Sequence, residues 1–547
     1  MPESLSGFLL SLTIFLPLVG AVVLMALPRP SDEEDGHGHA VAPAPGTAWR
    51  GRAVRVVALV FAALAFASSL LVAGAFRPGV RGFQLVQDAE WLPQFGMRYH
   101  LGIDGISLLL ILLTTFVTLL AVLYSFNVRR RLREYMVFML VLETAMLGVL
   151  SALDLVLFYV FWEAVLIPMY FLIGIWGHER RIYAAIKFFL YTFAGSILML
   201  VGIVYLYTHT GTLSLVELTT PGTRAYAALQ GLPAQALTYV YAAFALAFMI
   251  KVPMFPFHTW LPDAHVEAPA AGSVILASLM LKLGVYGFLR FCIPLFPDQA
   301  MASSPLFVLL AVIGIIYGAI VAAVQPDMKK LVAYTSVSHL GFVMLGIFSF
   351  TSLGMTGAVL QSINHGVSTG MLFFLVGMLY DRRHTREIAA YGGVKRALPV
   401  LSAFFLLAML SSVALPLTNG FVGEFTILQG SYLSIWSGPW PTAFATTGML
   451  LSAVYMFWLF QRVFTGPLDK PENAAMPDLT WRERLVLAPL VVMVFWFGCY
   501  VTTWTRYLDV PVAGLSTTVS RPGGQTPTRA VLAPARVRAS TDTEAIQ

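Results

Sequence analysis

Charged residues are scarce in this sequence: they make up 11% of its 547 residues, whereas hydrophobic residues make up 58%. An ordinary soluble protein is about 25% charged. The scarcity excludes a separate soluble domain of any size and predicts a membrane protein with many spans. The net charge of +6 does not indicate nucleic-acid binding, because the basic residues lie between the apolar stretches, where they determine topology.

Cysteine is almost absent, with only Cys292 and Cys499 in the whole chain. Two cysteines cannot hold an iron–sulfur cluster, and this pair fits no redox or metal spacing. The sequence also lacks a Gly-rich phosphate loop and any binding motif for haem or flavin, so we expect no cofactor in this chain. His37 and His39, beside a few acidic residues, are more typical of a solvent-exposed loop than of a metal site, and we expect no metal.

Fourteen apolar stretches are long enough to form spans, since a helical span needs about 20 residues. The first has no basic n-region and no cleavage site, which favours a retained span over a signal peptide. The twelfth exceeds one straight span and contains Pro416 and the pair Asn419–Gly420, which predicts two half-helices. The stretches are 6–27, 57–76, 105–126, 135–153, 155–176, 185–207, 238–258, 271–294, 305–324, 331–350, 355–380, 398–429, 441–461 and 485–505.

Lysine and arginine are concentrated in alternate loops, which predicts that those loops are cytoplasmic. With an even number of spans, both termini then lie outside the cytoplasm of a bacterial-type inner (cell) membrane. Lys329 and Lys330, at the start of the tenth span, are interpreted as cytoplasmic anchors. The linker 28–52 is expected to be flexible, and the polar segment 512–547 to be disordered. The largest basic clusters are Arg129, Arg130, Arg131 and Arg133, and then Arg382, Arg383 and Arg386.

Two apolar stretches near the middle of the chain each carry one lysine, Lys251 and Lys282. A lone ammonium in hydrocarbon is costly and marks a functional site by default. Pro253 and Pro256 follow Lys251, and because proline has no backbone N–H, the helix is expected to break there. A broken helix beside a buried charge is a common way to build an ion pathway. The alternative, a snorkelling lysine at a helix end, fits one such lysine better than two.

Three acidic residues lie inside predicted spans: Glu143, Glu163 and Glu424. A carboxylate in hydrocarbon is either protonated or paired, and Lys251 is the natural partner to propose for Glu163. The alternative for both Glu143 and Glu163 is an inert ion pair that fixes helix packing, and it carries more weight for Glu143.

Three histidines lie near or within spans: His258, His339 and His365. Histidine titrates close to neutral pH, which suits a proton relay. The alternative for each is a hydrogen-bonded core residue. The polar run TSVSH before and including His339 and the buried charges elsewhere favour the relay slightly.

The two predicted breaks lie five spans apart, one just after Lys251 and the other just before Glu424. An odd offset places equivalent units in opposite orientation, as in transporters with inverted repeats. We therefore predict an all-α polytopic membrane protein with two inverted five-helix repeats and discontinuous helices 7 and 12. The predicted parts are 1–130 (spans 1–3), 131–294 (first repeat), 295–465 (second repeat), 466–511 (last span) and 512–547 (tail).

Several long segments, in order, resemble the antiporter-like membrane subunits of respiratory complex I. The resemblance covers about 104–484 and is closest to the chain M, or subunit 4, branch. One departure is the run ALPLTNGF, where the family often has a glycine near the break. The segments are FWEAVLIPMYFLIGIWG, KVPMFPFHTWLPDAHVEAP, LKLGVYGFLRF, DMKKLVAYTSVSHLGFV, INHGVSTGMLFFLVGMLYDR and NGFVGEF.

The resemblance implies roles for individual residues. Glu163 matches the glutamate of the fifth helix that partners a lysine, and Lys251 matches the lysine of the broken seventh helix. Lys282 matches the central lysine of the eighth helix, and Glu424 matches the exit residue of the twelfth. The exit residue is a lysine in the related chains L and N, so Glu424 favours M. His339 and His365 match histidines on the family's hydrophilic axis.

The function implied is that of a non-redox, proton-translocating subunit of NADH–quinone oxidoreductase. FMN, iron–sulfur clusters and quinone are then expected in other subunits, and the related chains L and N and the lipid bilayer are the expected partners. The alternative from another class is a subunit of an Mrp-type cation/proton antiporter, which shares these motifs. A structural scaffold with an inert ionic network is a third hypothesis.

Overall fold

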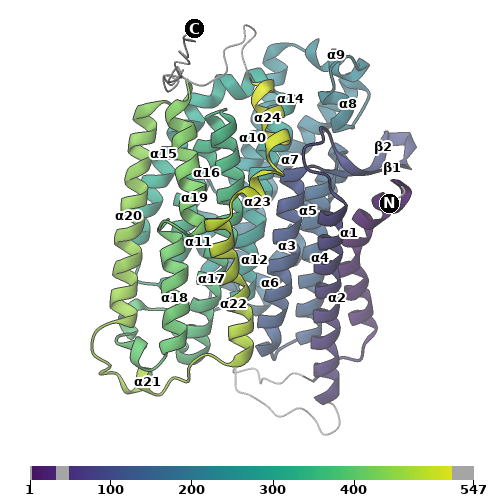
Figure 1. Ribbon diagram of the computed structural model, residues 1–547. Coiled ribbons are helices and arrows are strands. Elements are labelled where there is room, and N and C mark those ends of the chain that lie inside the picture. Colours follow the sequence, from purple (N-terminus) through teal and green to yellow (C-terminus); the bar gives the residue numbers. More distant parts are fainter. Residues whose placement is uncertain (1–2, 32–47, 520–547) are drawn as a thin grey trace, which may run out of the picture.

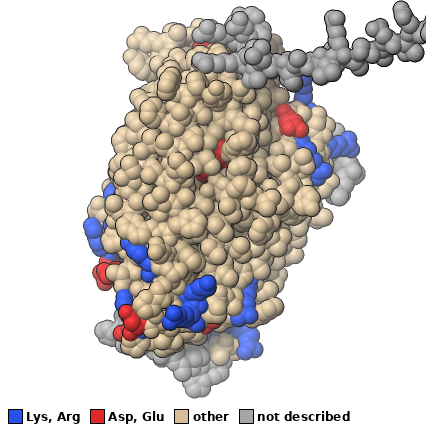
Figure 2. All heavy atoms as spheres, turned by 60° about the vertical axis from the view of Figure 1, so that its left-hand side comes forward, with Lys and Arg blue, Asp and Glu red and all other residues tan. Residues whose placement is uncertain are grey.

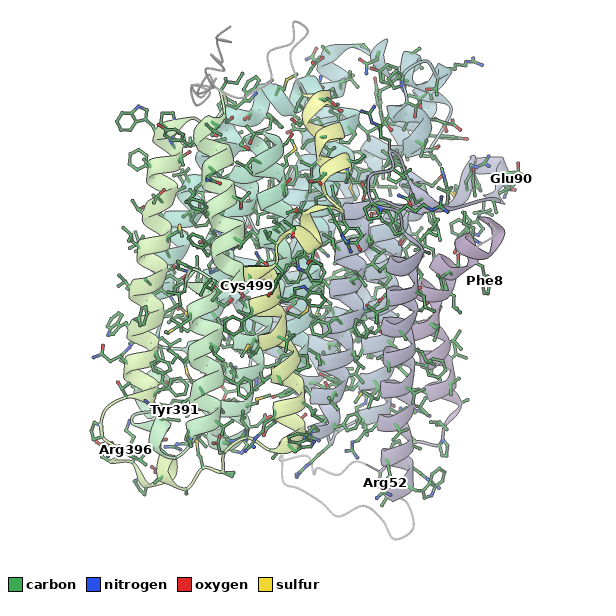
Figure 3. All side chains as sticks on the ribbon, viewed as in Figure 1. Phe8, Arg52, Glu90, Tyr391, Arg396 and Cys499 are labelled. Atoms are coloured by element: carbon green, nitrogen blue, oxygen red, sulfur yellow. The ribbon has the colours of Figure 1, made fainter. Side chains whose placement is uncertain are left out.

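The computed structural model describes residues 3–31 and 48–519. It is a bundle of long, roughly parallel helices (Figure 1), and in the described part twelve helices are long and apolar enough to cross a membrane. Arg52 and Arg396 lie at one end of the bundle, which we call the arginine-rich end, and Glu90 lies towards the opposite end (Figure 3). His37, His39 and 520–547 are outside the described residues, so the predictions for them stay predictions.

The first half of the bundle begins with helices that largely match the predicted spans. Asp104 and Asp154 accept backbone N–H groups at the starts of α3 and α5, which satisfies donors that a helix start leaves free. The helices are α1 (Glu3–Ala26), α2 (Ala48–Ala75), α3 (Gly105–Tyr124), α4 (Leu132–Ser151), α5 (Leu155–Ala164), α6 (Leu166–Trp176) and α7 (Arg181–Thr210), followed by the short α8 (Leu215–Thr219) and α9 (Arg224–Gln230).

A β-hairpin precedes α3 and was not predicted. Strands β1 (Gln84–Leu92) and β2 (Met97–Ile103) pair antiparallel, with Asp88 opposite His100. The hairpin projects from the bundle at the side of α1 (Figure 1), and the hydroxyl of Ser11 on α1 bonds to Tyr99 at 2.6 Å. The hairpin therefore packs against α1 near the start of its apolar stretch.

The seventh span is discontinuous, as predicted. Helix α10 (Ala234–Lys251) ends at Lys251, and α11 (Trp260–Glu267) begins after an irregular turn that contains both prolines. The indole of Trp260 donates to the carbonyl of Ile250 at 2.9 Å, so a carbonyl near the break keeps a partner although it faces no water.

The eighth span contains two wide helical turns around the segment that carries Lys282. It runs as α12 (Ala270–Ile275), the π-turn η3 (Leu276–Met280), α13 (Leu281–Gly287), the π-turn η4 (Phe288–Cys292) and α14 (Ile293–Leu295). Such turns shift the hydrogen-bond register by one residue and are frequent at functional sites. This span is buried throughout its apolar window, so Lys282 lies in the interior of the protein.

The second half repeats the pattern of long helices around one broken span. Helices α18 (Pro399–Ser412) and α19 (Asn419–Leu433) confirm the predicted break near Pro416. The prediction of a disordered tail is wrong for its first residues, which belong to α24 (Asp509–Thr518). The other helices are α15 (Pro297–Ala323), α16 (Met328–Phe348), α17 (Ser352–Arg383), α20 (Pro439–Phe464), α21 (Pro471–Ala474), α22 (Trp481–Cys499) and α23 (Thr502–Thr505).

Charge and apolar surface separate along the bundle axis. Lys and Arg gather near one end of the face in Figure 2, and its middle is almost free of charge. Large apolar side chains are exposed on the outer helices, such as Leu450 and Val454 in the middle of α20. The inner helices α16 and α17 are buried almost throughout. An apolar outer surface with the polar and charged groups kept inside or at the ends is the arrangement expected of a bundle in a bilayer.

Candidate functional site

Four of the predicted charged residues lie in the protein interior. Glu143, Lys251, Lys282 and Glu424 are each at most 2% exposed, whereas Glu163 is half-buried. Charges this far from solvent need partners or a change of protonation, so the contacts around each one decide what it can do.

Glu163 and Lys251 lie at the ends of two broken helices, α5 and α10. Among the described residues neither forms an ion pair within 4.0 Å, so the direct contact that the sequence suggests is absent in this structure. Lys251 Nζ instead lies 5.1 Å from the ring centroid of Trp162, the residue before Glu163. The carboxylate is within interaction range of Tyr159 and Ser196. Lys251 thus lies beside the helix turn that carries Glu163 without pairing with its carboxylate.

Lys282 is held by two contacts inside the bundle. Its Nζ donates to the carbonyl of Ala277, in the wide turn before it, at 2.5 Å, and lies 2.6 Å from Nδ1 of His365 on α17. His365 is 2% exposed and its Nε2 has no partner among the described residues. The ammonium therefore has one neighbour that can take its proton.

His339 and Glu424 form the second close pair. Nδ1 of His339 on α16 lies 2.7 Å from Oε1 of Glu424 on α19, and Nε2 lies 3.2 Å from Oγ of Ser412. The amide of Gln361 donates to the same carboxylate oxygen at 2.9 Å. A contact of this length is a close hydrogen bond that joins the imidazole to the carboxylate.

The two pairs meet at the histidines. The ring centroids of His339 and His365 are 5.7 Å apart. Both rings line a small polar cavity of about 10 Å³, the least volume that accommodates one water molecule. Lys282, His365, His339 and Glu424 are therefore consecutive members of one polar line across α13, α17, α16 and α19. The cavity is completed by Gln361, Asn364, Ser368, Thr369, Ser411, Ser412 and Gly420.

The break between α18 and α19 brings Glu424 into this line. Asn364 donates to the carbonyl of Asn419 at 2.7 Å, and Ser368 and Ser411 interact with the Asn419 side chain. A Cβ on Gly423 would lie 2.3 Å from the side-chain oxygen of Gln361, so only glycine allows α19 to approach α17 this closely. Asn419, from the pair that predicts the break, and Gly423, one turn later, thus fix the geometry of the site.

Two candidate relay residues lie apart from the line. Glu143 is fully buried in α4, and its carboxylate oxygens have no hydrogen-bond partner among the described residues. His258 lies in the turn between α10 and α11, with its ring 5.1 Å from that of Tyr317. The structure joins neither of them to Lys282 or Glu424 by a hydrogen bond or an ion pair within the described part of the chain.

Sequence reasoning missed two interior groups. Gln361, one turn before His365, bonds directly to Glu424, and its place in a span was a signal that could have been used. His265 is fully buried, stacks on Phe373 at 4.5 Å and lies within electrostatic range of Lys282. It follows His258 by seven residues in the same motif, so it was equally visible in the sequence.

Lys329, which the sequence predicts to be a cytoplasmic anchor, does not extend into solvent. Its side chain is 4% exposed, and its Nζ donates to the carbonyl of Ala268 at 2.5 Å. It lines a cavity of about 620 Å³ among basic loop residues that include Arg130 and Arg386. Burial, Lys329 and Arg386 lower the pKa of the nearby loop residue His178 to about 3, so His178 is neutral at physiological pH.

A family profile described as "NADH:quinone oxidoreductase/Mrp antiporter, TM" matches residues 152–452. The chain is 45% identical over 511 residues to NADH-quinone oxidoreductase subunit M of Rhodobacter capsulatus, covering 93% of this chain and 96% of the relative. It is 39% identical over 509 residues to NADH-ubiquinone oxidoreductase chain 4 of Marchantia polymorpha, covering 92% and 96%.

Solved structures show the same fold. A chain of respiratory complex I from Thermus thermophilus with bound NADH superposes with a TM-score of 0.81 at 32% identity, covering 94% of this chain and all (100%) of that chain. A chain of the Mrp complex from Dietzia sp. DQ12-45-1b superposes with a TM-score of 0.77 at 22% identity, covering 94% and 52%. The second likeness concerns the fold alone.

Proposed function

Because the chain belongs to the family of NADH-quinone oxidoreductase subunit M, or chain 4, we propose that it moves protons through Glu163, Lys251, Lys282 and Glu424. It is an antiporter-like, proton-translocating membrane subunit of complex I. The observation that carries the assignment of residues is the polar line in which Lys282 contacts His365 and Glu424 contacts His339.

Each contact in this line joins a group that can give a proton to one that can take it. Burial away from water favours the neutral amine of lysine, so Lys282 can pass its proton to Nδ1 of His365, which becomes the imidazolium. A proton released from Nε2 of His365 reaches His339 across the small cavity, and Glu424 accepts it or stabilises the imidazolium. Lys282 is then neutral and ready to be protonated again.

The half of the site around Glu163 supplies the switch. When the carboxylate of Glu163 is away from Lys251, the buried ammonium of Lys251 has no counter-charge and is disfavoured. When the two side chains meet, the ion pair stabilises the ammonium. Redox chemistry elsewhere in the complex would bias this pairing and so drive protonation along the chain. Glu143 and His258 are further candidate relay groups, since both are buried and each has side-chain atoms without a hydrogen-bond partner among the described residues.

The remaining components lie in other chains of the assembly. We propose that FMN, the iron–sulfur clusters and quinone are held by other subunits. The described residues include no group of three or more His, Cys, Asp or Glu arranged to hold a metal ion. The related chains L and N are the proposed neighbours in a bacterial-type inner membrane, and the apolar outer surface suits contact with lipid and with such neighbours.

We expect Glu424→Gln to lower NADH-driven proton pumping to about a tenth or less of the wild-type rate, because a positioned proton-transfer group typically contributes about 10²–10⁴-fold. Glutamine keeps the shape and can still accept the amide of Gln361, so the complex should assemble. Glu424→Lys should retain more activity than Glu424→Ala, because lysine also titrates. The measurement is dye-detected proton uptake in reconstituted vesicles.

The matched control for Glu424 is Glu472→Gln, which changes an exposed glutamate at the arginine-rich end. It should pump at the wild-type rate. Wild-type pumping by Glu424→Ala would show that Glu424 is structural, and the line would then need another final group.

The orientation of the chain gives a separate prediction. Cysteine at Asp298 should react with an impermeant thiol reagent added outside intact cells, and cysteine at Arg129 should not, because loops rich in Lys and Arg stay in the cytoplasm. Both sites are exposed. Cys499 is also exposed, so the test uses a Cys499→Ser background. The proposed orientation places both termini outside the cytoplasm, and the reverse labelling pattern would contradict it.

A further inference from the structure

A second large cavity lies at the end opposite the arginine-rich end, over the helix that carries Lys282. Its volume is about 610 Å³, and its walls come from 76–83, the start of α3, the helix turn η4 and the C-terminal segment around α24. Asp104 and Arg290 both line it. They form an ion pair of 2.6 Å with side chains 10% and 9% exposed, so a buried charge pair separates the cavity from the interior.

Arg290 is fixed in place by more than this ion pair. Its Nη2 donates to Oγ of Ser107 at 3.2 Å, and its Nε donates to the hydroxyl of Tyr286 at 3.1 Å. The ring of Phe83 lies 4.8 Å from the guanidinium on the side of the loop before β1. These partners hold the Arg290 guanidinium in one position, and in that position the guanidinium blocks the inner end of the cavity.

The same helix connects this block to Lys282. Tyr286 and Arg290 follow Lys282 by four and eight residues, which places all three on one helix face over about 12 Å. The hydroxyl of Tyr286 also donates to the carbonyl of Leu150 at 3.1 Å. Polar groups therefore continue from the level of Lys282 to the cavity, in a direction away from His365 and Glu424.

We propose that the Asp104–Arg290 pair is a closed gate in a second route between Lys282 and the medium at this end. While the pair is closed, the guanidinium, which keeps its proton in proteins, blocks the opening and repels protons that approach from the cavity. If the pair parts, water from the cavity reaches Tyr286 and the Lys282 side. The inference rests on the proposed function in one respect, that Lys282 carries protons.

The test measures passive proton leak through the whole complex in vesicles without NADH, driven by a potassium diffusion potential. Arg290→Gln should raise the rate of proton leak about tenfold, because loss of the buried ion pair lowers the barrier to proton passage between the cavity and Lys282. Asp104→Asn removes the carboxylate that pairs with Arg290 with little change of shape, and should leak more than wild type but less than Arg290→Gln, because Ser107 and Tyr286 still hold the guanidinium. The double variant Asp104→Arg/Arg290→Asp restores a pair of opposite charges and should leak less than either single variant.

The matched control is Arg98→Gln, which breaks the exposed Arg98–Asp88 pair of the hairpin and should not leak. Adding Lys282→Ala to Arg290→Gln should return the leak to the wild-type level, because the route passes through Lys282. Assembled Arg290→Gln and Asp104→Asn complexes as tight as wild type would overturn the gate. A leak that persists in Lys282→Ala/Arg290→Gln would overturn the route through Lys282, whereas pumping by Lys282→Ala alone tests the proposed function.

Discussion

Lys282→Ala should lower quinone-linked NADH oxidation and proton pumping together, to about a tenth or less of the wild-type rates. The variant removes the group that contacts both the Ala277 carbonyl and His365, and alanine cannot carry a proton. NADH oxidation by an artificial acceptor that draws electrons from the soluble arm should be unchanged, because we place every redox group in other subunits. The three rates are measured on the same purified complex.

The control for Lys282 is Lys330→Ala, which removes the same charge from a half-buried position at the start of α16 and should leave all three rates near wild type. Loss of artificial-acceptor activity in a fully assembled Lys282→Ala complex would contradict the division of labour between this chain and the redox subunits. Normal proton pumping by the Lys282→Ala complex would show that Lys282 is not part of the proton pathway.

Lys251→Arg should assemble and yet lose quinone-linked turnover to about a tenth or less. Lysine can give up a proton when it is desolvated, whereas arginine stays charged in proteins. The Lys251 ammonium is buried, has no hydrogen-bond partner among the described residues and lies 5.1 Å from the ring centroid of Trp162, so no hydrogen bond holds its proton in place. Lys251→Ala should lose turnover as well, because Glu163 then has no cation to pair with.

A static ion pair between Glu163 and Lys251 gives a different pattern of rates. Arginine would replace lysine well, and only alanine would be harmful. Turnover of the arginine variant relative to the alanine variant therefore distinguishes a proton carrier from a structural cation.

The sequence predicted the spans and both helix breaks because these depend on local chemistry. Proline after Lys251 and the Pro416 and Asn419–Gly420 run act within a few residues of where they stand. A buried charge in an apolar stretch is equally local, and Lys282 and Glu424 are indeed interior. The β-hairpin before α3 was missed because its strands alternate poorly between apolar and polar residues.

The contacts inside the site could not be predicted in the same way. Lys282 and His365 are 83 residues apart, and His339 and Glu424 are 85 apart, so only the packing of α13, α16, α17 and α19 shows which residues meet. The two wide turns beside Lys282 contain no proline and leave no sequence signal that we recognise.

Burial of Lys329 shows a further limit of sequence patterns. A lysine at the start of a span has the same pattern whether it extends into solvent or folds back onto a neighbouring carbonyl. Only the position of Ala268, at the end of α11, decides between the two. The same limit applies to Glu163 and Lys251. The family resemblance predicts that these residues are partners, but not whether their side chains are in contact.

The most direct test of the central claim is NADH-driven proton pumping by the Lys251→Arg complex in sealed vesicles, measured beside wild type at equal amounts of assembled complex. The proton pathway predicts pumping at about a tenth of the wild-type rate or less, with artificial-acceptor activity retained. Near-normal pumping by Lys251→Arg would contradict it, because a side chain that never releases its proton cannot be a member of the relay.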